Sequence, residues 1–397
     1  MEFSLNRKEL KTALTALKPC LPAKPLNELE ANMLIKVSPA GGLIVATDMV
    51  QEGVMPLTLV TAPVEPLEIL PDIKKLEKVL AKTDSEEVEM SYQDGTGILR
   101  VASGKGFVDV PTLPPKKLGR YDAPMTEGEL LGAVPSSVLA DGLSYVSCFM
   151  PETITGNLKF EVAILEGGLL SAANGWNRRG FFVSTALKLP KELKILQRFA
   201  ECLPKLLRHV PGQLNVILHE RSIVLTSENG FRYSCVRAKH ETPAPVLSYL
   251  RSNDPYLVVE MGKLVKILDK VVVPDYQAAG APVGVAVTVP PAEAGSTAST
   301  MELELVSTGN LQARDTIPCT REGETATPGG ELIEKVIDYR MFKAIASQIP
   351  SKSDTRVYMS NPACRFFKFQ SKFMVDTYPC VAVAVGTYSK RIGHAAQ

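Results

Sequence analysis

The chain has 397 residues, 45% of them hydrophobic and 22% charged, and its formal net charge is +1. This composition predicts ordinary buried cores and excludes a bulk polycation, so basic residues matter only where they gather on one surface. Seven scattered cysteines without CxxC spacing argue against a disulfide framework or a zinc site, and indicate a reducing, cytoplasmic setting. The most apolar run, 271–289, holds Asp275, Gln277 and two prolines, so neither a membrane span nor a membrane partner is predicted.

The first region is predicted to fold as a strand, a helix, two strands, a second helix and further strands. Both helices are amphipathic, with aliphatic residues on one face and basic residues on the other. Glycine pairs and an Asp-Gly pair mark the turns between strands. The expected elements are a strand through Phe3 and Leu5, helices over 6–18 and 73–82, strands over 32–39 and 41–60, and a hairpin about Asp94-Gly95.

The second and third regions repeat this order of elements. The expected elements are helices over 135–148, 191–208, 262–272 and 331–349, with strands that turn at Gly167-Gly168, Asn174-Gly175 and Asn229-Gly230. Three copies of one unit predict an α+β protein of three repeated domains, each with two helices packed on antiparallel sheets. The predicted domains are 1–122, 123–253 and 254–397.

Five of these helices carry basic residues opposite their apolar stripe. One such face is usually just a solvated surface. Five in three repeats favour a shared negative partner, and duplex DNA fits because lysine neutralises phosphate without reading base sequence. The cations concerned are Arg7, Lys8, Lys11, Lys74, Lys75, Lys78, Lys82, Lys191, Lys194, Arg198, Lys263, Lys266, Lys270, Arg340 and Lys343.

Over its whole length the sequence resembles the bacterial-type DNA sliding clamps, the β subunit of DNA polymerase III. MEFSLNRKELKTAL and LIVATDMVQEGVMPL are similar to the opening helix and the strand–TD–strand step of that family. VPTLPPKKLGRYDAP resembles the exit from its first domain, SAANGWNRRGFF its ATDGHRLA segment, and YLVVEMGKLVKILDKVV the start of its third domain. The order of these short segments over three repeats makes the resemblance specific.

The resemblance implies a head-to-tail homodimeric ring of clamp domains that encircles double-stranded DNA whatever its sequence. It implies a processivity factor without enzymatic activity or cofactor, which tethers DNA polymerase and a clamp loader through short peptide motifs. Lys24 matches a position that faces DNA in the family. The implied partner-peptide pocket comprises Thr155, Ala173, Gly175, Trp176, Asn177, Arg178, Pro243, Leu247, Val383 and Val385. The implied dimer interface comprises Phe107, Val108, Val110, Leu268, Val271 and Val272.

Some features depart from the family and leave alternatives open. Asn174–Arg178 replaces its DGHRL pattern, Thr153 and Ile154 replace two aromatic residues, and the tail Gly386–Gln397 runs on past the last strand. Trp176 could equally pack in a sheet. The alternatives for the whole chain are a clamp-like paralogue that acts as a protein-binding module, and a nucleic-acid enzyme. Against an enzyme, the four histidines lack metal-ligand spacing and no catalytic constellation is evident.

Overall fold

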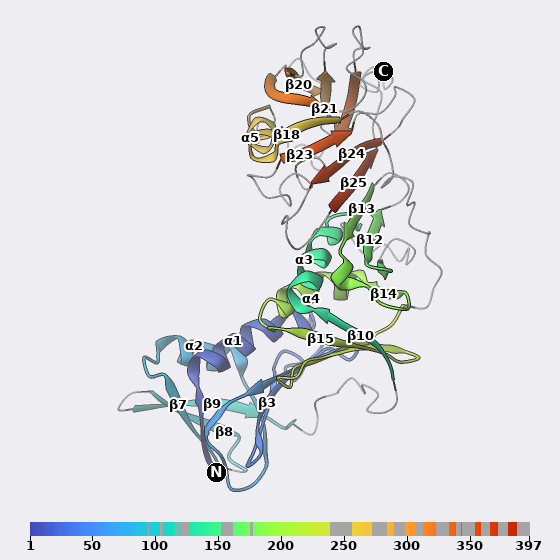
Figure 1. The fold of residues 1–397 in the computed structure, drawn as a ribbon. Coiled ribbons are helices and arrows are strands. Elements are labelled where there is room, and N and C mark those ends of the chain that lie inside the picture. The colour runs from blue at the N-terminus through green and yellow to red at the C-terminus, as the bar shows by residue number, and fades with distance from the viewer. Residues whose placement is uncertain are drawn as a thin grey trace. The chain divides into compact units, whose positions relative to one another are not determined.

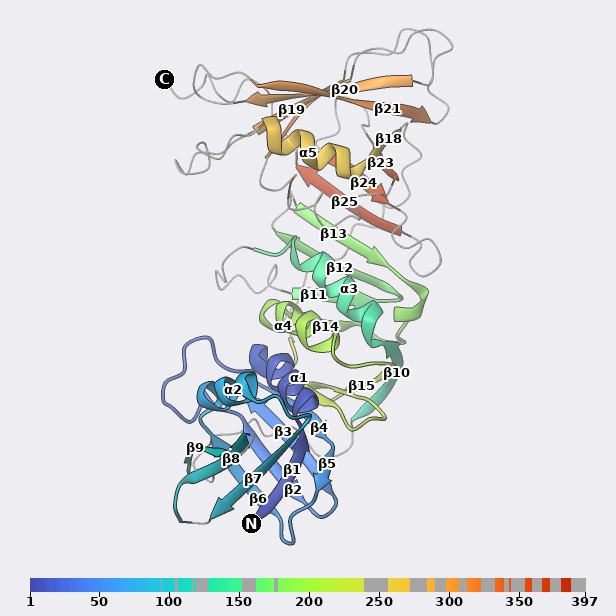
Figure 2. The ribbon, with the colours of Figure 1, turned by 90° about the vertical axis from the view of Figure 1, so that its left-hand side faces the viewer.

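The structure is a computed structural model, and it describes residues 1–93, 95–103, 106–115, 118, 128–151, 162–174, 178–238, 256–271, 284–289, 298–306, 313–322, 333–338, 343, 354–358, 366–371 and 380–386. The chain divides into two compact units. Unit 1 comprises Met1–Leu143 and Leu189–Lys239, and unit 2 comprises Ser144–Lys188 and His240–Gln397. Each unit contains antiparallel strands with helices packed against them (Figures 1 and 2).

Unit 1 is built on a thirteen-stranded sheet in the order β10-β15-β16-β17-β4-β3-β2-β6-β9-β8-β7-β1-β5. Its strands are β1 (Glu2–Asn6), β2 (Leu34–Ser38), β3 (Gly41–Thr47), β4 (Gln51–Leu57), β5 (Leu59–Thr61), β6 (Leu67–Pro71), β7 (Glu87–Gln93), β8 (Ile98–Ser103), β9 (Gly106–Leu113), β10 (Glu129–Pro135), β15 (Gln213–Leu218), β16 (Ser222–Thr226) and β17 (Arg232–Val236). Strand β4 pairs with β17, from Val54 opposite Arg232 to Gln51 opposite Cys235. The sheet therefore continues from the first predicted region into the second.

Helices α1 (Arg7–Leu17) and α2 (Ile73–Lys82) lie side by side on one face of this sheet (Figure 2). Each begins at a side-chain cap: Asn6 accepts a hydrogen bond from the Glu9 N–H at 3.1 Å, and Asp72 accepts one from the Lys75 N–H at 3.0 Å. Their leucines are buried against the sheet, as the helical period predicts. These two helices confirm the predictions for 6–18 and 73–82. Helix α3 (Ser136–Ser147) likewise confirms the helix expected over 135–148.

The helix expected over 191–208 is wrong in its first third. Leu193–Leu196 forms strand β14, and helix α4 covers only Gln197–Leu207. In β14 the side chains of Leu193 and Ile195 are buried and those between them are less so, which is the two-residue alternation of a strand. Leu196 ends this strand and is the N-cap residue of α4, with no side-chain hydrogen bond to the helix. The apolar residues of 191–196 fit either period, and the packing selects the strand.

Unit 2 contains a second antiparallel sheet with the order β11-β12-β13-β25-β24-β23-β18-β21-β20-β19-β22. Helix α5 (Met261–Val271) packs against β18, β20 and β21 (Figure 1). Its strands are β11 (Val162–Glu166), β12 (Leu169–Asn174), β13 (Arg178–Val183), β18 (Tyr256–Glu260), β19 (Gly284–Val289), β20 (Ala298–Val306), β21 (Arg314–Glu322), β22 (Ile333–Asp338), β23 (Asp354–Tyr358), β24 (Phe366–Ser371) and β25 (Cys380–Gly386).

Strand β22 contradicts the helix expected over 331–349, at least for its first part. Residues 333–338 pair with all of β19, from Ile333 opposite Val289 to Asp338 opposite Gly284. Six residues of ladder pairing override the local helical preference of this segment. Lys343 is helical, whereas Arg340 lies outside the described residues.

The turns predicted from glycine pairs are confirmed where the structure describes them. The β11–β12 turn holds Gly167 at φ 58° and Gly168 at φ 88°, and a Cβ on Gly168 would lie 2.7 Å from the Ser184 carbonyl oxygen. Asp94 and Gly175 lie outside the described residues, although the strands on either side of each pair as hairpins. The domain boundaries after 122 and 253 also fall outside them and remain a prediction.

Candidate nucleic-acid interface

The basic face of α1 and α2 forms as the helical period predicts. Lys8 and Lys11 are exposed on α1. On α2 the exposed cations are Lys74, Lys75, Lys78 and Lys82, while Leu76 and Leu80 are buried beneath them. The buried stripe fixes each helix on the sheet and leaves its lysines in solvent. Lys24 is also exposed, on the loop between η1 (Lys18–Cys20) and β2.

Two further cations, Arg7 and Lys18, form interactions with other residues of unit 1. The half-buried Arg7 guanidinium donates to the Thr83 carbonyl oxygen at the end of α2, and Lys18 Nζ lies 2.7 Å from a carboxylate oxygen of Glu77. Arg7 therefore joins the two helices rather than projecting a free charge. In the part of the chain that the structure describes, no carboxylate pairs with Lys8, Lys11, Lys24, Lys74, Lys78 or Lys82.

The cations predicted on the 191–208 helix do not share one helical face. Lys191 and Lys194 precede α4, and they pair with Glu129 at 2.5 Å and with Glu192 at 3.0 Å. Only Arg198 lies on α4. Two exposed cations of this helix were missed, namely Lys205 and Arg208. They follow Arg198 by seven and ten residues, so the helical period that grouped Arg198 with Lys191 and Lys194 also selects Lys205.

The basic residues of α5 are exposed but mostly paired. Lys263 lies 2.7 Å from Glu260, Lys270 lies 3.8 Å from Asp315, and Lys343 lies 2.6 Å from Asp269. Exposed pairs of this kind contribute little to stability, and a phosphate can compete for the lysine. Lys266 is exposed and has no carboxylate partner among the described residues.

Arg198 is held by the buried carboxylate of Asp48, at the corner between β3 and β4. The Asp48 side chain has no exposed surface, whereas that of Arg198 is 43% exposed. Asp48 Oδ1 accepts from the backbone N–H groups of Val50 and Gln51, at 3.2 and 3.0 Å. Its Oδ2 accepts from Gln51 Nε2 at 2.8 Å and from the Arg198 guanidinium. A buried carboxylate is tolerated only with donors such as these.

A group of buried polar side chains surrounds this pair. The Tyr233 hydroxyl donates to Gln51 Oε1 at 2.8 Å, and the Cys20 and Cys202 sulfur atoms lie 4.0 Å apart. The hydrogen bond with Cys202 and burial raise the pKa of the Cys20 thiol, and burial raises the pKa of Tyr233. Both groups are therefore neutral near pH 7, and Arg198 balances the charge of Asp48. Arg198 is an anchor of α4 as well as a candidate phosphate contact.

The predicted partner-peptide pocket can be followed only in its backbone. Strand β13 lies between β12 and β25. Ala173 is paired with Arg179, and Arg178 is paired with Val385 on the final strand. Val383 is paired with Gly180. These strands bring together four of the predicted positions, and the remaining ones lie outside the described residues: Thr155, Gly175, Trp176, Asn177, Pro243 and Leu247.

Two residues of the predicted dimer interface are buried inside their own units, and two others are exposed. Phe107 is 58% exposed and Val108 is 37% exposed on β9, where Val108 borders a hollow of about 290 Å³ beside Lys75, Lys78 and Lys82. Val110 and Leu268 are wholly buried in their own units, so their side chains cannot contact another chain without unfolding. Val271 ends α5, and Val272 lies outside the described residues.

Two other observations concern the described residues as a whole. Among them no group of three or more histidine, cysteine, aspartate or glutamate side chains could hold a metal ion. None of their helices combines the length and the apolar character needed to span a membrane.

Comparison with solved structures decides the fold. The DNA polymerase III β subunit of Thermotoga maritima matches 98% of this chain and 99% of its own, with a TM-score of 0.77 and 15% identity. The β subunit of Pseudomonas aeruginosa matches 98% and 100%, with a TM-score of 0.72 and 17% identity. The sliding clamp of Bacillus subtilis matches 98% and 99%, with a TM-score of 0.74 and 13% identity. The chain has the bacterial sliding-clamp fold.

This match confirms the predicted α+β fold class. It also confirms, at the level of the fold, the resemblance to sliding clamps that the sequence shows. No family model matches the chain, and no curated protein matches it. With identities of 13–17%, the sliding-clamp fold is retained although most side chains differ. The particular side chains of this chain therefore have to carry any further argument.

The Asp48–Arg198 pair yields a stability prediction. Asp48→Ala leaves the Arg198 guanidinium and buried backbone donors unpaired, and should lower the free energy of unfolding by about 3 kcal/mol. Arg198→Ala should cost about 1 kcal/mol, because the exposed guanidinium is solvated and Asp48 keeps its other donors. Urea unfolding measures both, with Arg208→Ala as the control on the same helix. A loss for Asp48→Ala no greater than for Arg208→Ala would contradict the assigned role of Asp48.

Proposed function

We propose that this chain is a DNA sliding clamp, a non-enzymatic processivity factor. Two chains would join head to tail into a ring that encircles duplex DNA and tethers a polymerase. The observation that carries the proposal is the sliding-clamp fold over 98% of the chain, together with lysines exposed on the helices of that fold. Enclosure makes the complex long-lived without tight contacts, so weak and uniform charge contacts suffice.

The exposed lysines suit a surface over which DNA must move. Lys74, Lys78 and Lys82 on α2, and Lys266 on α5, have no carboxylate partner among the described residues. Each can displace a counterion from a phosphate, which gives attraction without sequence preference. A flexible lysine imposes no bidentate geometry, so the contacts can exchange as the DNA slides.

Charge reversal tests this surface. Replacing Lys74, Lys78, Lys82 and Lys266 together by glutamate should weaken DNA association and make the slope of log affinity against log salt shallower by about 3 to 4. Any single replacement should change little, because each contact is exposed and screened. Affinity for a labelled duplex over a salt series measures the slope, and the fourfold lysine-to-arginine variant is the charge-matched control. Unchanged affinity and slope in the glutamate variant would remove these lysines from the DNA surface.

The dimer is proposed to form where β9 exposes apolar side chains. Residues 106–110 of β9 pair with β8 on one side only among the described strands, because β6 reaches only Thr112 and Leu113. An exposed edge with two apolar side chains is a site where another chain can add. Phe107 and Val108 of one chain would meet the end of α5 of the other, at Val271 and Val272.

Solution mass tests the dimer. The native protein should have twice the chain mass of 43.0 kDa. Phe107→Glu and Val272→Glu should each give folded monomers, because a carboxylate would be buried in the interface without a partner. Val60→Glu is the control, since Val60 is 55% exposed on β5 of the same unit and lies outside the proposed interface. Dimers of both interface variants at low micromolar concentration, by sedimentation, would refute the assignment.

A partner-peptide pocket is proposed beside β13 and the final strand. The backbone pairing of β12, β13 and β25 places Ala173, Arg178, Val383 and Val385 on three adjacent strands. One similar structure, the Pseudomonas aeruginosa clamp, is bound to griselimycin, so that protein has a ligand site. Trp176 follows β12 in sequence and is the only tryptophan of the chain, so its fluorescence reports on this segment alone.

Peptide titration tests the pocket. A peptide of the Gln-Leu-x-Leu-Phe kind should change the Trp176 fluorescence and bind with micromolar affinity, about −8 kcal/mol. Trp176→Ala should weaken binding by about 1–3 kcal/mol, as loss of an aromatic anchor does. Trp176→Phe, which keeps an aromatic ring, should weaken it less; polarisation of a labelled peptide measures both variants. Equal affinity for the native protein and Trp176→Ala would make Trp176 a packing residue only.

A further inference from the structure

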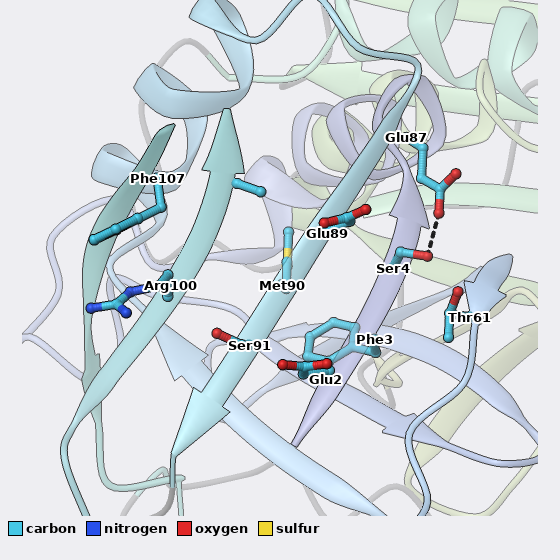
Figure 3. A pocket seen from close by; sticks show the side chains of 11 residues that line it. Glu2, Phe3, Ser4, Thr61, Glu87, Glu89, Met90, Ser91, Arg100 and Phe107 are labelled. Carbon is cyan, nitrogen blue, oxygen red and sulfur yellow. Dashed lines mark hydrogen bonds between the residues drawn. The ribbon is translucent and has the colours of Figure 1, made fainter. Parts of the chain in front are cut away.

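A second candidate site lies on unit 1, on the sheet face opposite α1 and α2. Strand alternation places Phe3 and Leu5 of β1 in the core beneath the helices and directs Ser4 to the other face. On that other face a hollow of about 350 Å³ opens across β5, β1, β7, β8 and β9 (Figure 3). The DNA and peptide surfaces proposed above do not include it.

The hollow exists because short and long side chains alternate across β1, β7, β8 and β9, near one end of the sheet. Ser4 on β1 is opposite Glu89 on β7, and Ala102 on β8 is opposite Phe107 on β9. Ser4, Ala102, Glu89 and Phe107 all line the hollow, and the two short side chains leave room between the two long ones. Long and short side chains that alternate across strands thus create a trough that can take the side chains of an extended peptide.

One wall of the trough carries negative charge. Glu2, Glu87 and Glu89 are exposed along β1 and β7. Glu87 accepts a hydrogen bond from the Ser4 hydroxyl at 2.6 Å. The side chains of Glu2 and Glu89 have no hydrogen-bond or ion-pair partner within the described ranges. Two carboxylates therefore face solvent with their charge unbalanced.

The opposite wall is an aromatic ring whose neighbouring cation is already neutralised. Arg100 donates to both oxygens of Asp109, at 3.0 and 3.3 Å, and its Cζ lies 3.8 Å from the centre of the Phe107 ring. The hydrogen bond from Arg100 lowers the pKa of Asp109, and the same bond raises the pKa of Arg100. Because Arg100 is already paired with Asp109, it does not compensate the negative charge of Glu2 and Glu89. Phe107 itself stays 58% exposed.

We infer that this trough docks a short lysine- and arginine-rich segment of a partner protein. The carboxylates of Glu2 and Glu89 would pair with its cations. A nucleic acid is disfavoured here, because its phosphates would meet carboxylates of like charge. The same sheet thus has lysines over one face and glutamates on the other, and the two faces select partners of opposite charge.

The acidic wall of the trough is compatible with the proposed dimer. The dimer uses the free edge of β9, whereas the acidic wall lies on β7 and β1, which follow β8 in the sheet order. A second chain at the β9 edge would cover Phe107 at the rim of the trough and leave Glu2 and Glu89 open. The inference also needs no DNA, so it can hold or fail independently of the clamp function.

Binding of a defined basic peptide to the full chain tests the inference. The probe is a fluorescein-labelled seven-residue peptide that alternates lysine or arginine with alanine, measured by polarisation at low salt. Glu2→Gln/Glu89→Gln should weaken binding about tenfold, as loss of two charge-assisted contacts does. This variant keeps Glu87, and with it the hydrogen bond from Ser4, and an unchanged melting temperature and dimer mass show that the fold is intact.

The matched control separates a site from general attraction. Glu65→Gln/Glu166→Gln changes the net charge equally at two exposed glutamates away from the trough, and should weaken binding by less than about twofold. Adding Glu87→Gln to the trough variant should weaken binding further. Equal weakening by the trough and control variants would overturn the inference, and so would native-like binding by the trough variant or no binding by the native protein.

Discussion

Burial of the Asp48 carboxylate constrains unit 1 where its first and second sequence regions meet. A carboxylate without exposed surface requires donors, and they come from its own turn, from Gln51 and from Arg198 of α4. Gln51 in turn accepts from Tyr233 of β17, the strand that extends the first region's sheet into the second. One buried charge thus fixes a sheet corner, a helix and a strand junction together. Losing Asp48 itself would leave the buried Gln51 N–H without its hydrogen-bond acceptor.

The exposed charges of unit 1 are separated between the two faces of its sheet. The apolar faces of α1 and α2 are buried against the sheet. Their lysines therefore project from the side that faces away from the sheet. On the other side of the same sheet, strand alternation presents Ser4, Glu87 and Glu89. A net charge of +1 therefore conceals two surfaces of opposite sign. In the proposed clamp this separation would let the helix-covered face attract phosphate while the other face does not.

Patterns that rest on local chemistry were predictable from the sequence. Helix α2 has the predicted bounds, because an Asp72 cap and a clear helical period agree there. The errors arose where tertiary packing decides the secondary structure. Residues 193–196 and 333–338 are strands because their side chains are buried in the core or their backbone pairs with a neighbouring strand. Neither the pairing of Arg198 with Asp48 nor the burial of Val110 and Leu268 has a local signal, since each depends on residues distant in the chain.

The central claim is that the protein holds DNA by enclosing it rather than by gripping it. Retention on a nicked circular plasmid, before and after one restriction cut, measures this most directly. The protein is loaded with a clamp loader and ATP, separated from free protein by gel filtration, and followed after linearisation at moderate salt. The account predicts that protein stays on the circle and is lost from linear DNA, because a ring slides off a free end. Equal retention on circular and linear DNA would contradict it.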